Sequence, residues 1–437
     1  MLSAAENELL TRTGKGTPGG EYFRRFWMPA LLSEEVPVPD CPPVRVKLFG
    51  ECLVAFRDTS GRVGLVGAYC AHRQVDLFFG RNEHNGLRCL YHGWKYDADG
   101  NCVDIPTDPE GKLKKNVQIP AYPCKEYAGI VWAYLGPKEL PAQVPQFEFN
   151  SLPAENVYIN KSLLECNWVQ AMEGNLDSSH LKFLHSFLVT GAGAPMHEVS
   201  ATATASPEQL RDKKRAADAI RNVVPSYEVA ETEFGFMLGA KRKLADGSAY
   251  WRINQWLLPN HTMVSNAPGQ TLLWDAWVPM DDEHTWVYRV EYNPWRPISQ
   301  EEKFEFENAG LTHLNVQNIP GSYLPLRNRR NDYLIDRALQ RSYSFSGIKG
   351  SNAQDAAVIE NQGPTPIYDR TKEHPVVGDV GIVRARRRLL KVFKDLQDGI
   401  EPVPAMKGEL YRVRPIAVFL DDDGTPFHEA AKQHLYY

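Results

Sequence analysis

The sequence lacks the features that mark membrane, secreted and nucleic-acid-binding proteins. No stretch approaches the ~18 consecutive apolar residues of a membrane-spanning helix. The first ten residues, MLSAAENELL, contain no basic segment followed by an apolar one, so a signal peptide is not expected. The 49 Lys and Arg residues are outnumbered by 54 Asp and Glu, and the net charge of −5 offers no basic field for nucleic acid.

Cysteine is also scarce. Seven cysteines, an odd number, are scattered over 437 residues. This usage is typical of a reducing compartment, and we therefore expect a cytoplasmic location. Five of the seven are expected to be free thiols: Cys41, Cys52, Cys102, Cys124 and Cys166. The other two, Cys70 and Cys89, each have a histidine close by in the sequence, which indicates a metal site.

The length of the chain exceeds the size at which a single hydrophobic core usually stops growing. Its hydrophobic content of 43% and aromatic content of 11% are ordinary for a globular protein. The sequence contains neither an internal repeat nor a low-complexity tract. Two globular domains are therefore predicted.

Two cysteines and two histidines form the densest metal-ligand pattern. They lie in the segments AYCAHR and RCLYHGW, with the spacing Cys-x-His-x16-Cys-x2-His: Cys70, His72, Cys89 and His92. This mixture suits a Rieske-type [2Fe-2S] cluster, with the cysteines on one iron and the histidines on the other. Replacing two thiolates by neutral imidazoles raises the reduction potential of such a cluster, so the chain is predicted to handle electrons.

A structural zinc ion is the alternative for the same four residues, because two cysteines and two histidines are also a zinc pattern. Two local features favour the cluster. The Cys-x-His segment is too short for a standard zinc-finger pair. After the second histidine, Gly93 allows the backbone to approach closely and Trp94 can shield the site from water.

The residue pattern changes twice along the chain. Residues 1–28 contain two short helical segments, the first opened by a capping box at Ser3 and Glu6. Residues 29–140 contain short segments rich in Val, Tyr and Gly, which are typical of the strands of a small antiparallel barrel or sandwich. Residues 150–437 mix helical segments with the long strands of an antiparallel sheet. A proline-rich stretch separates the last two regions.

A second candidate site lies in the segment DSSHLKFLH. On a helix, Asp177 and His180 share a face, and His185 reaches the same point only if the helix bends or loosens. Two histidines and one carboxylate form the metal-binding triad of non-haem Fe(II) oxygenases, which leaves positions open for O2 and substrate. We expect the carboxylate to come from a distant segment, with Asp355 as the first candidate and Glu360 as the alternative.

A His-x4-His pair is, by itself, more often two unrelated helix histidines than a metal site. The Cys/His motif upstream reverses these odds. An electron carrier that feeds an O2-activating iron is a coherent combination, and two unrelated motifs in this order are not expected by accident.

Taken in order along the chain, these motifs resemble the α subunit of Rieske non-haem iron oxygenases. Asn167-Trp168 and Gln354 beside Asp355 also match, and the resemblance covers nearly the whole length. The segments CNWVQAMEGNLDSSHLKFLH and ENQGPTPIYDRTKEH look most like the phthalate dioxygenase branch, which includes chlorobenzoate and phenoxybenzoate oxygenases. Glu173 departs from related oxygenases, which carry Asn near this place.

The resemblance implies an α+β fold. An N-terminal all-β Rieske [2Fe-2S] domain would occupy residues 29–140 and a helix-grip catalytic domain with a mononuclear Fe(II) site residues 150–437, with the helices of 1–28 packed on the catalytic domain. It also implies a homotrimer or a stacked hexamer. The cluster of one subunit would then serve the iron of the next, with Asp177 bridging a cluster histidine and an iron-ligating histidine.

The implied activity is that of a terminal oxygenase that hydroxylates an aromatic carboxylate of the phthalate, isophthalate or chlorobenzoate type. Electrons from NAD(P)H would arrive through a separate reductase with a flavin and a [2Fe-2S] centre. A monooxygenase or O-demethylase that cleaves an aryl ether is the alternative within this class. A non-enzymatic electron carrier and a zinc-stabilised binding module are the alternatives outside it.

An arginine facing the ring carboxylate is the expected substrate anchor, because guanidinium groups pair with carboxylates through two hydrogen bonds. Arg252 is the first candidate, and Asn254 shares its strand face. An exposed strand cation is an equally good interpretation of Arg252, since alternation alone does not say which face lines a pocket. Lys241 and Arg242 are weaker candidates. Ser179, like its neighbour Ser178, is a candidate hydrogen-bond donor to the carboxylate.

Overall fold

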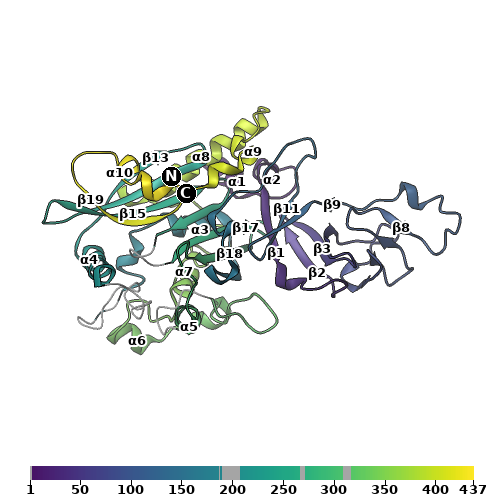
Figure 1. Cartoon of the computed structure of the whole chain (residues 1–437), viewed down its shortest axis with the longest axis horizontal. Helices are drawn as coiled ribbons and strands as arrows, with labels where there is room; N and C mark the ends of the chain where they lie inside the picture. Colours follow the sequence, from purple (N-terminus) through teal and green to yellow (C-terminus); the bar gives the residue numbers. More distant parts are fainter. Residues whose placement is uncertain (1, 187, 189–206, 266–270, 309–315) are drawn as a thin grey trace.

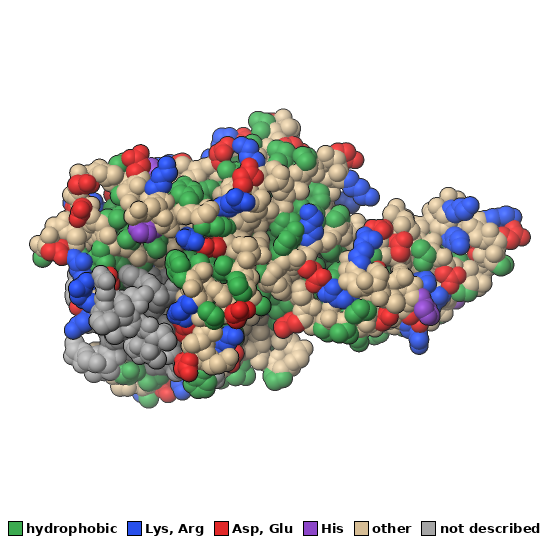
Figure 2. Space-filling view, in the orientation of Figure 1, with side chains coloured by type: hydrophobic (Ala, Val, Ile, Leu, Met, Phe, Trp, Pro, Cys, Tyr) green, Lys and Arg blue, Asp and Glu red, His purple; other side chains and the backbone are tan. Residues whose placement is uncertain are grey.

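The computed structural model describes residues 2–186, 188, 207–265, 271–308 and 316–437. Figure 1 shows a large body that holds both chain termini and a narrower lobe that projects from it, with β8 (Cys102–Asp104) near the far end. Acidic and basic side chains are interspersed over the visible face of both parts (Figure 2). Among the described helices, none combines the length and apolar character that a membrane span needs.

The projecting lobe is built from two small antiparallel sheets. The first has the strand order β2-β3-β4-β9: Val44–Leu48, Glu51–Arg57, Val63–Gly67 and Ala121–Tyr122. The second has the order β5-β6-β7-β8, the first three spanning Arg81–Asn82, Leu87–Arg88 and Lys95–Tyr96. The lobe has a buried core of its own, which includes Phe56, Leu87 and Tyr96 together with Cys70 and Cys89. The two predicted cluster thiols are therefore part of this local core.

A three-stranded antiparallel sheet joins the lobe to the body. Its order is β1-β11-β10: Trp27–Leu32, Ile130–Tyr134 and Cys124–Tyr127. The strands β1 and β11 are fully buried, and Trp132 of β11 packs on Trp274 of the body with ring centroids 6.0 Å apart. The main hydrophobic core runs without a break from this sheet into the body.

The body is organised around an eight-stranded antiparallel sheet. Seven strands follow the order β12-β18-β17-β16-β15-β14-β13: Val157–Leu164, Thr285–Tyr292, Leu272–Pro279, His261–Val264, Ser248–Leu257, Gly235–Lys243 and Ser226–Glu231. The eighth strand, β19 (Ile416–Asp421), pairs with β15. The sequence predicts long alternating strands in this region, and the sheet contains them.

Helices cover one face of this sheet and the buried sheet of β1 and β11 lies against the other. The helix α3 (Trp168–Leu176) contacts β16, β17 and the helix α7 (Ser351–Ile359), and α8 (Val380–Gln397) contacts β14. On the opposite face, His261 and Trp274 stack on each other beside Trp132. The remaining described helices are α4 to α6 and α9 to α11: Pro207–Asn222, Gln300–Asn308, Arg337–Ser342, Val403–Met406, Phe427–Ala430 and Lys432–Leu435.

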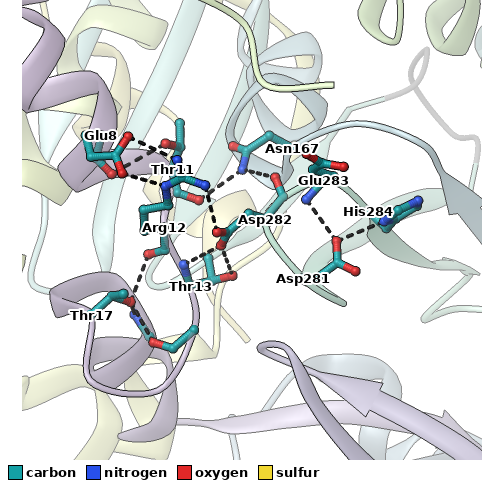
Figure 3. Close-up of polar contacts among 12 residues, drawn as sticks. Glu8, Thr11, Arg12, Thr13, Thr17, Asn167, Asp281, Asp282, Glu283 and His284 are labelled. Atoms are coloured by element: carbon teal, nitrogen blue, oxygen red, sulfur yellow. Dashed lines mark hydrogen bonds and ion pairs between the residues drawn. The ribbon is translucent and has the colours of Figure 1, made fainter. Parts of the chain in front are cut away.

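The N-terminal helices pack on the body. The helices α1 (Ala4–Thr11) and α2 (Pro18–Arg24) both contact α8, and the capping box predicted at Ser3 and Glu6 is present. Figure 3 shows how the turn between β17 and β18 joins this contact, because Asp282 accepts hydrogen bonds from Arg12 (3.0 Å) and the Thr13 amide (2.8 Å). The Asn167 amide group donates to the carbonyls of Thr11 (3.0 Å) and Asp282 (2.7 Å), which fixes the start of α3.

The helix expected through His180 and His185 is not formed, and that expectation is wrong. The helix α3 ends at Leu176, and Asp177 has extended backbone angles (φ −100°, ψ 113°). The Asp177 carboxylate accepts a hydrogen bond from the Ser179 amide at 2.6 Å, and such short polar side chains compete with helical backbone bonds. A single 3-10 turn at His180–Lys182 follows.

Candidate metal centres

The cluster motif forms two tight loops at neighbouring points of the lobe. The Cys70 amide donates to Val75 and the Cys89 amide to Trp94, which closes each loop on itself. Gly93 has φ +76°, and a Cβ there would lie 3.0 Å from Pro106. The loop therefore needs glycine for both its backbone angle and its packing, as expected.

The side chains of these loops are arranged by depth. Cys70 and Cys89 are buried, whereas His72 is exposed and His92 half-buried. The two imidazole rings lie 4.5 Å apart, and Trp94 stacks on His72 at 4.8 Å with an interplanar angle of 6°. The buried Nδ1 of His92 has no hydrogen-bond partner among the described residues, which suits a nitrogen reserved for a metal.

The spread of these donor atoms separates a cluster from a zinc ion. Four ligands of one tetrahedral zinc ion lie within about 3.8 Å of one another, given its bond lengths. Among the described residues, the one group of three or more donors within 4.8 Å of one another is His180, His185 and Asp355, so the Cys/His set is more widely spaced. The two histidine rings, 4.5 Å apart, and the two buried cysteines form separate pairs, which fits a cluster with one iron held by each pair.

The second site brings together three side chains from two segments. His180 and His185 come from the turn after α3, and Asp355 lies on α7. The Nε2 atoms of His185 and His180 lie 3.1 and 3.7 Å from the same Asp355 oxygen, Oδ1. Both imidazoles thus direct the same ring nitrogen toward one carboxylate, which is the donor set of a two-histidine, one-carboxylate iron site.

Neighbouring residues fix the orientation of these ligands. The Nδ1 atom of His185 lies 2.6 Å from Oε1 of Gln354, whose amide nitrogen donates to the Ile348 carbonyl at 2.8 Å. This arrangement leaves Nε2 of His185 free to face Asp355. Gln354 is thus a second functional residue of the segment that carries Asp355.

Glu360, the alternative carboxylate, does not join the site. Its side chain accepts hydrogen bonds from the Glu165 amide at 2.7 Å and from the Tyr333 hydroxyl, and it caps the end of α7. The structure brings Asp355 to the two histidines and leaves Glu360 occupied elsewhere, so that alternative is wrong.

Asp177 lies beside the triad without being part of it. Its Oδ2 is 3.5 Å from Nδ1 of His180, the nitrogen that faces away from Asp355. Burial raises the pKa of Asp177, but contacts from His180 and Ser179 outweigh this effect and bring the pKa to about 2. The carboxylate is therefore ionised at neutral pH and orients the His180 ring.

A cavity of about 70 Å³ opens between the triad and the sheet. Arg252 and Asn254 line it, which resolves the strand parity that the sequence left open. Ser178 also lines it, whereas Ser179 is exposed and hydrogen-bonded to Asp177. The structure therefore does not bring Ser179 into the cavity, because the extended backbone after α3 turns it outward.

Two buried arginines lie on the same sheet face as the cavity. Ala240 pairs with Arg252 and Tyr250 pairs with Arg242 across β14 and β15, so the two guanidinium groups project to one side. Arg252 is 3% exposed and Arg242 is 2% exposed. Burial and the nearby charge of Arg252 lower the pKa of Arg242 to about 10. Lys241, by contrast, pairs with Asp422.

Neither arginine has an acidic partner among the described residues. One nitrogen of Arg252 donates to the Ser265 carbonyl at 2.6 Å, while Nε and NH1 of Arg242 are buried without a hydrogen-bond partner in that part of the chain. Two buried like charges without compensation are costly. The arrangement therefore suits a negatively charged ligand.

A polar network behind the triad was not foreseen from the sequence. Arg289 lines the cavity and forms a buried ion pair with Asp275 (2.6 Å), which also accepts a hydrogen bond from the Asn175 amide (2.6 Å). The charge of Arg289 helps to hold the pKa of Asp355 low, after the histidines. The alternation of β17 and β18 places Asp275 and Arg289 on the helix-covered face, but one sequence does not say which face that is.

Comparisons with known proteins identify the class. The family of the Rieske [2Fe-2S] domain matches residues 26–123, and the family described as LigXa C-terminal domain like matches residues 133–417. The chain belongs to the Rieske non-haem iron oxygenases, as an oxygenase subunit of the phthalate dioxygenase-like branch. The expected α+β fold and the expected cofactors, a [2Fe-2S] cluster and a mononuclear iron, are thereby confirmed.

Two oxygenase subunits and one solved structure illustrate what the chain is similar to. The chain is 38% identical to the 3-chlorobenzoate-3,4-dioxygenase oxygenase subunit of Comamonas testosteroni, over 100% of this chain and 99% of the relative. It is also 38% identical to the phthalate 4,5-dioxygenase oxygenase subunit of Pseudomonas putida, over 91% and 88%. A structure of the Pseudomonas putida CBB5 NdmA QL mutant with theobromine shares the fold, with a TM-score of 0.58, 19% identity and coverage of 89% and 95%. As an oxygenase subunit, the chain works with a separate component that supplies electrons.

Proposed function

We propose that this chain is the terminal oxygenase of a system that hydroxylates an aromatic carboxylate. Cys70, His72, Cys89 and His92 would hold the [2Fe-2S] cluster, and His180, His185 and Asp355 the iron. When bound, the two centres supply one-electron transfer and O2 activation. The observation that carries the proposal is the cavity that lies between the triad and Arg252, a buried arginine of the sheet with no acidic partner among the described residues.

The chain's own residues would orient the substrate and keep water away. Arg252 is the anchor for the ring carboxylate, because its guanidinium group has donors to spare and lies in the same cavity as His180 and Asp355. Asn254 already accepts a hydrogen bond from the Ser265 amide at 3.1 Å, so its role is to position Ser265 and to contact the substrate edge. The apolar side chains of Val264 and Leu273 would hold the ring.

The pair of arginines favours a doubly charged acid over a singly charged one. A single carboxylate compensates one guanidinium group and leaves the other buried and unpaired, which costs binding free energy. An aromatic dicarboxylate of the phthalate or isophthalate type compensates both. We therefore rank dicarboxylates above chlorobenzoates among the expected substrates.

The assembly is proposed to be a homotrimer, alone or stacked as a hexamer. The cluster loops lie in the projecting lobe, while α3 and α7 lie in the body (Figure 1). His72 is exposed in the lobe of one chain, and Asp177 is ionised beside the triad of another. A contact between the two residues across an interface would bring the cluster and the iron together. The electrons would come from NAD(P)H through a separate flavin and [2Fe-2S] reductase in the cytoplasm.

A substrate panel with labelled oxygen tests this function. Purified protein, NADH and a surrogate reductase are incubated under ¹⁸O2 with phthalate, isophthalate, 3-chlorobenzoate and an aryl methyl ether. Product with two labelled oxygens from a dicarboxylate is the expected result. One labelled oxygen together with formaldehyde from the ether would replace the proposal by an O-demethylase, and no labelled product from any acid would remove it.

A further inference from the structure

A buried carboxylate one helical turn before Asp177 is held by two arginines. Glu173 is 6% exposed on α3, and Arg386 of α8 binds both of its oxygens at 2.6 and 3.0 Å. Arg370, which is fully buried, binds the same two oxygens at 3.3 and 3.2 Å. Burial raises the pKa of Glu173, but the two arginines outweigh it and hold the pKa below its usual range, so the group is charged.

The arginines extend this contact to a fourth charge and to the N-terminal helix. Arg386 also pairs with Glu373, which makes a cluster of two acids and two bases with no net charge. Arg370 donates to Asn7 on α1 (3.2 Å) and to the Tyr368 carbonyl (3.3 Å). The cluster therefore ties α1, α3 and α8 to the segment 368–375.

The helices α3 and α8 and the segment 368–375 line a cavity of about 490 Å³. Asp177, His180 and Asp355 of the iron site line the same cavity, as do Lys372 and His374 on either side of Glu373. Its described lining includes no residue of the sheet, in contrast to the smaller cavity that Arg252 lines. Apart from the neutral cluster of Glu173 and Glu373 with their arginines, the described lining of the larger cavity contains three acids, Asp177, Asp355 and Asp379, and one lysine, Lys372.

The cluster end of the projecting lobe, meaning the loops that carry His72 and His92, has the properties of an occupant for this cavity. Leu90 and Tyr91 are 59% and 51% exposed beside the half-buried His92, and such exposed apolar side chains indicate a surface that is covered in the assembly. Arg73 lies over the Tyr91 ring at 5.6 Å and supplies a positive charge that complements the acidic lining. We take the occupant to be this end of a second copy of the chain.

We infer that Glu173 is a positioning residue for electron delivery between subunits. Through its ion pairs with Arg370 and Arg386, Glu173 holds the cavity wall formed by residues 368–379 in place. The cluster end of a neighbouring subunit can then pack against this wall and Asp177. The inference rests on the proposed assembly and deepens it. Without the Glu173 charge, Arg386 would keep Glu373 as its acidic partner, Arg370 would have none among the described residues, and the two buried guanidinium groups would repel each other. The wall would then move away from α3 while both metal sites keep their ligands.

Mixed assemblies test the direction of this effect. One chain carries Cys70→Ser and keeps the iron site, and the other carries His185→Ala and keeps the cluster. The two chains, with different tags, are co-expressed and purified together. Glu173→Gln is introduced either into the iron-providing chain or into the cluster-providing chain, and Glu165→Gln, which loses the solvent-exposed pairing with Arg330, serves as the matched control.

Activity should fall at least about tenfold when Glu173→Gln is in the iron-providing chain and stay unchanged when it is in the cluster-providing chain. Equal losses in both arrangements would overturn the inference, since a general folding defect has no direction. No activity from the mixture without Glu173→Gln would instead contradict the proposed assembly. Glu373→Gln, at the edge of the cluster, should give a smaller loss in the same direction.

A second readout uses protein free of metals. Hydrogen–deuterium exchange of the backbone amides of 368–379 should rise in Glu173→Gln, while the exchange of β15 and β17 and the melting temperature of the lobe stay as in the unsubstituted chain. Unchanged exchange in 368–379 would show that Glu173 does not hold this wall and would overturn the inference.

Discussion

The two metal centres are built on different scales. All four cluster residues come from one stretch of sequence, 70–92, and sit on a small core of their own in the projecting lobe. The iron site collects residues from 175 to 355, and it depends on a sheet face, the end of α3 and the position of α7. A local sequence motif therefore specifies the cluster site, whereas tertiary packing specifies the iron site.

The largest effects are expected when one ligand is removed from either metal site, because each substitution should empty one site and leave the other intact. Cys89→Ser should remove the cluster absorbance and leave the body folded, because the lobe has a separate core. His185→Ala should keep the cluster spectrum and lose the iron, since it removes one of three ligands. Both should abolish product formation. Metal analysis, visible absorbance and thermal unfolding of each variant measure this, and loss of the cluster spectrum in His185→Ala would contradict it.

Arg252→Ala should weaken substrate binding without changing the metal content of either site. Truncating one partner of a buried charge pair costs about 3 kcal/mol. We therefore expect kcat/KM for a dicarboxylate to fall roughly a hundredfold, with cluster and iron content unchanged. The melting temperature should rise or hold, because a buried uncompensated charge is removed. Steady-state kinetics and a melting curve measure this, and an unchanged apparent affinity for every acid would remove Arg252 from the cavity.

The connection between the two regions should depend on a buried ion pair. Lys161 of β12 is enclosed by the rings of Trp286, Tyr288 and Tyr323, and its ammonium group lies 2.7 Å from Glu35 beside β1. Lys161→Met should lower the free energy of unfolding by about 3 kcal/mol, because the Glu35 carboxylate, which is only 14% exposed, is left without its cationic partner.

Urea unfolding measures this effect of Lys161→Met. The exposed pair of Arg62 and Asp99 provides the control, since Asp99→Asn should change stability by less than about 0.5 kcal/mol. Equal effects of the two substitutions would contradict the account of the interdomain pair.

The smallest expected effect is a pH dependence at the turn between the regions. A hydrogen bond from His284 to Asp281 raises the pKa of His284, and Asp281 also binds Lys47 of the lobe (Figure 3 shows the His284 contact). Because the pKa of His284 is raised in the folded state, protonation of His284 stabilises the fold. This stabilisation is fully present below about pH 6.5, the pKa in the unfolded state, and is lost as pH rises through the folded-state pKa.

His284→Gln should remove this pH dependence. The difference in unfolding free energy between pH 5.5 and 8 should change by less than about 1 kcal/mol, because the pair is partly exposed and screened. Urea unfolding at the two pH values measures it, and an identical pH dependence in both proteins would rule out the His284 contribution.

The sequence predicted more of the cluster site than of the iron site, for physical reasons. Cys70, His72, Cys89 and His92 lie in loops whose hydrogen bonds close locally, so their spacing and the neighbouring Gly93 and Trp94 indicate this site. The sequence indicates Asp355 as the first candidate from its donor type and Glu360 as the alternative, and only the contacts of Glu360 with Glu165 and Tyr333 separate the two.

Other features of the iron site depend on distant packing. The end of α3 at Leu176 follows from the competition of Asp177 for local amides, which a helical spacing does not reveal. The cavity face of Arg252 depends on the sheet as a whole. The partners of Glu173 lie 197 and 213 residues away, so its clamp had no local signal.

The content of metal and labile sulfide in the purified protein tests whether the chain holds both a [2Fe-2S] cluster and a mononuclear iron. The account predicts about three irons and two acid-labile sulfides per chain, a Rieske-type EPR signal on reduction, and loss of one iron with the cluster signal kept in Asp355→Ala. Zinc in place of iron, without labile sulfide, would contradict it.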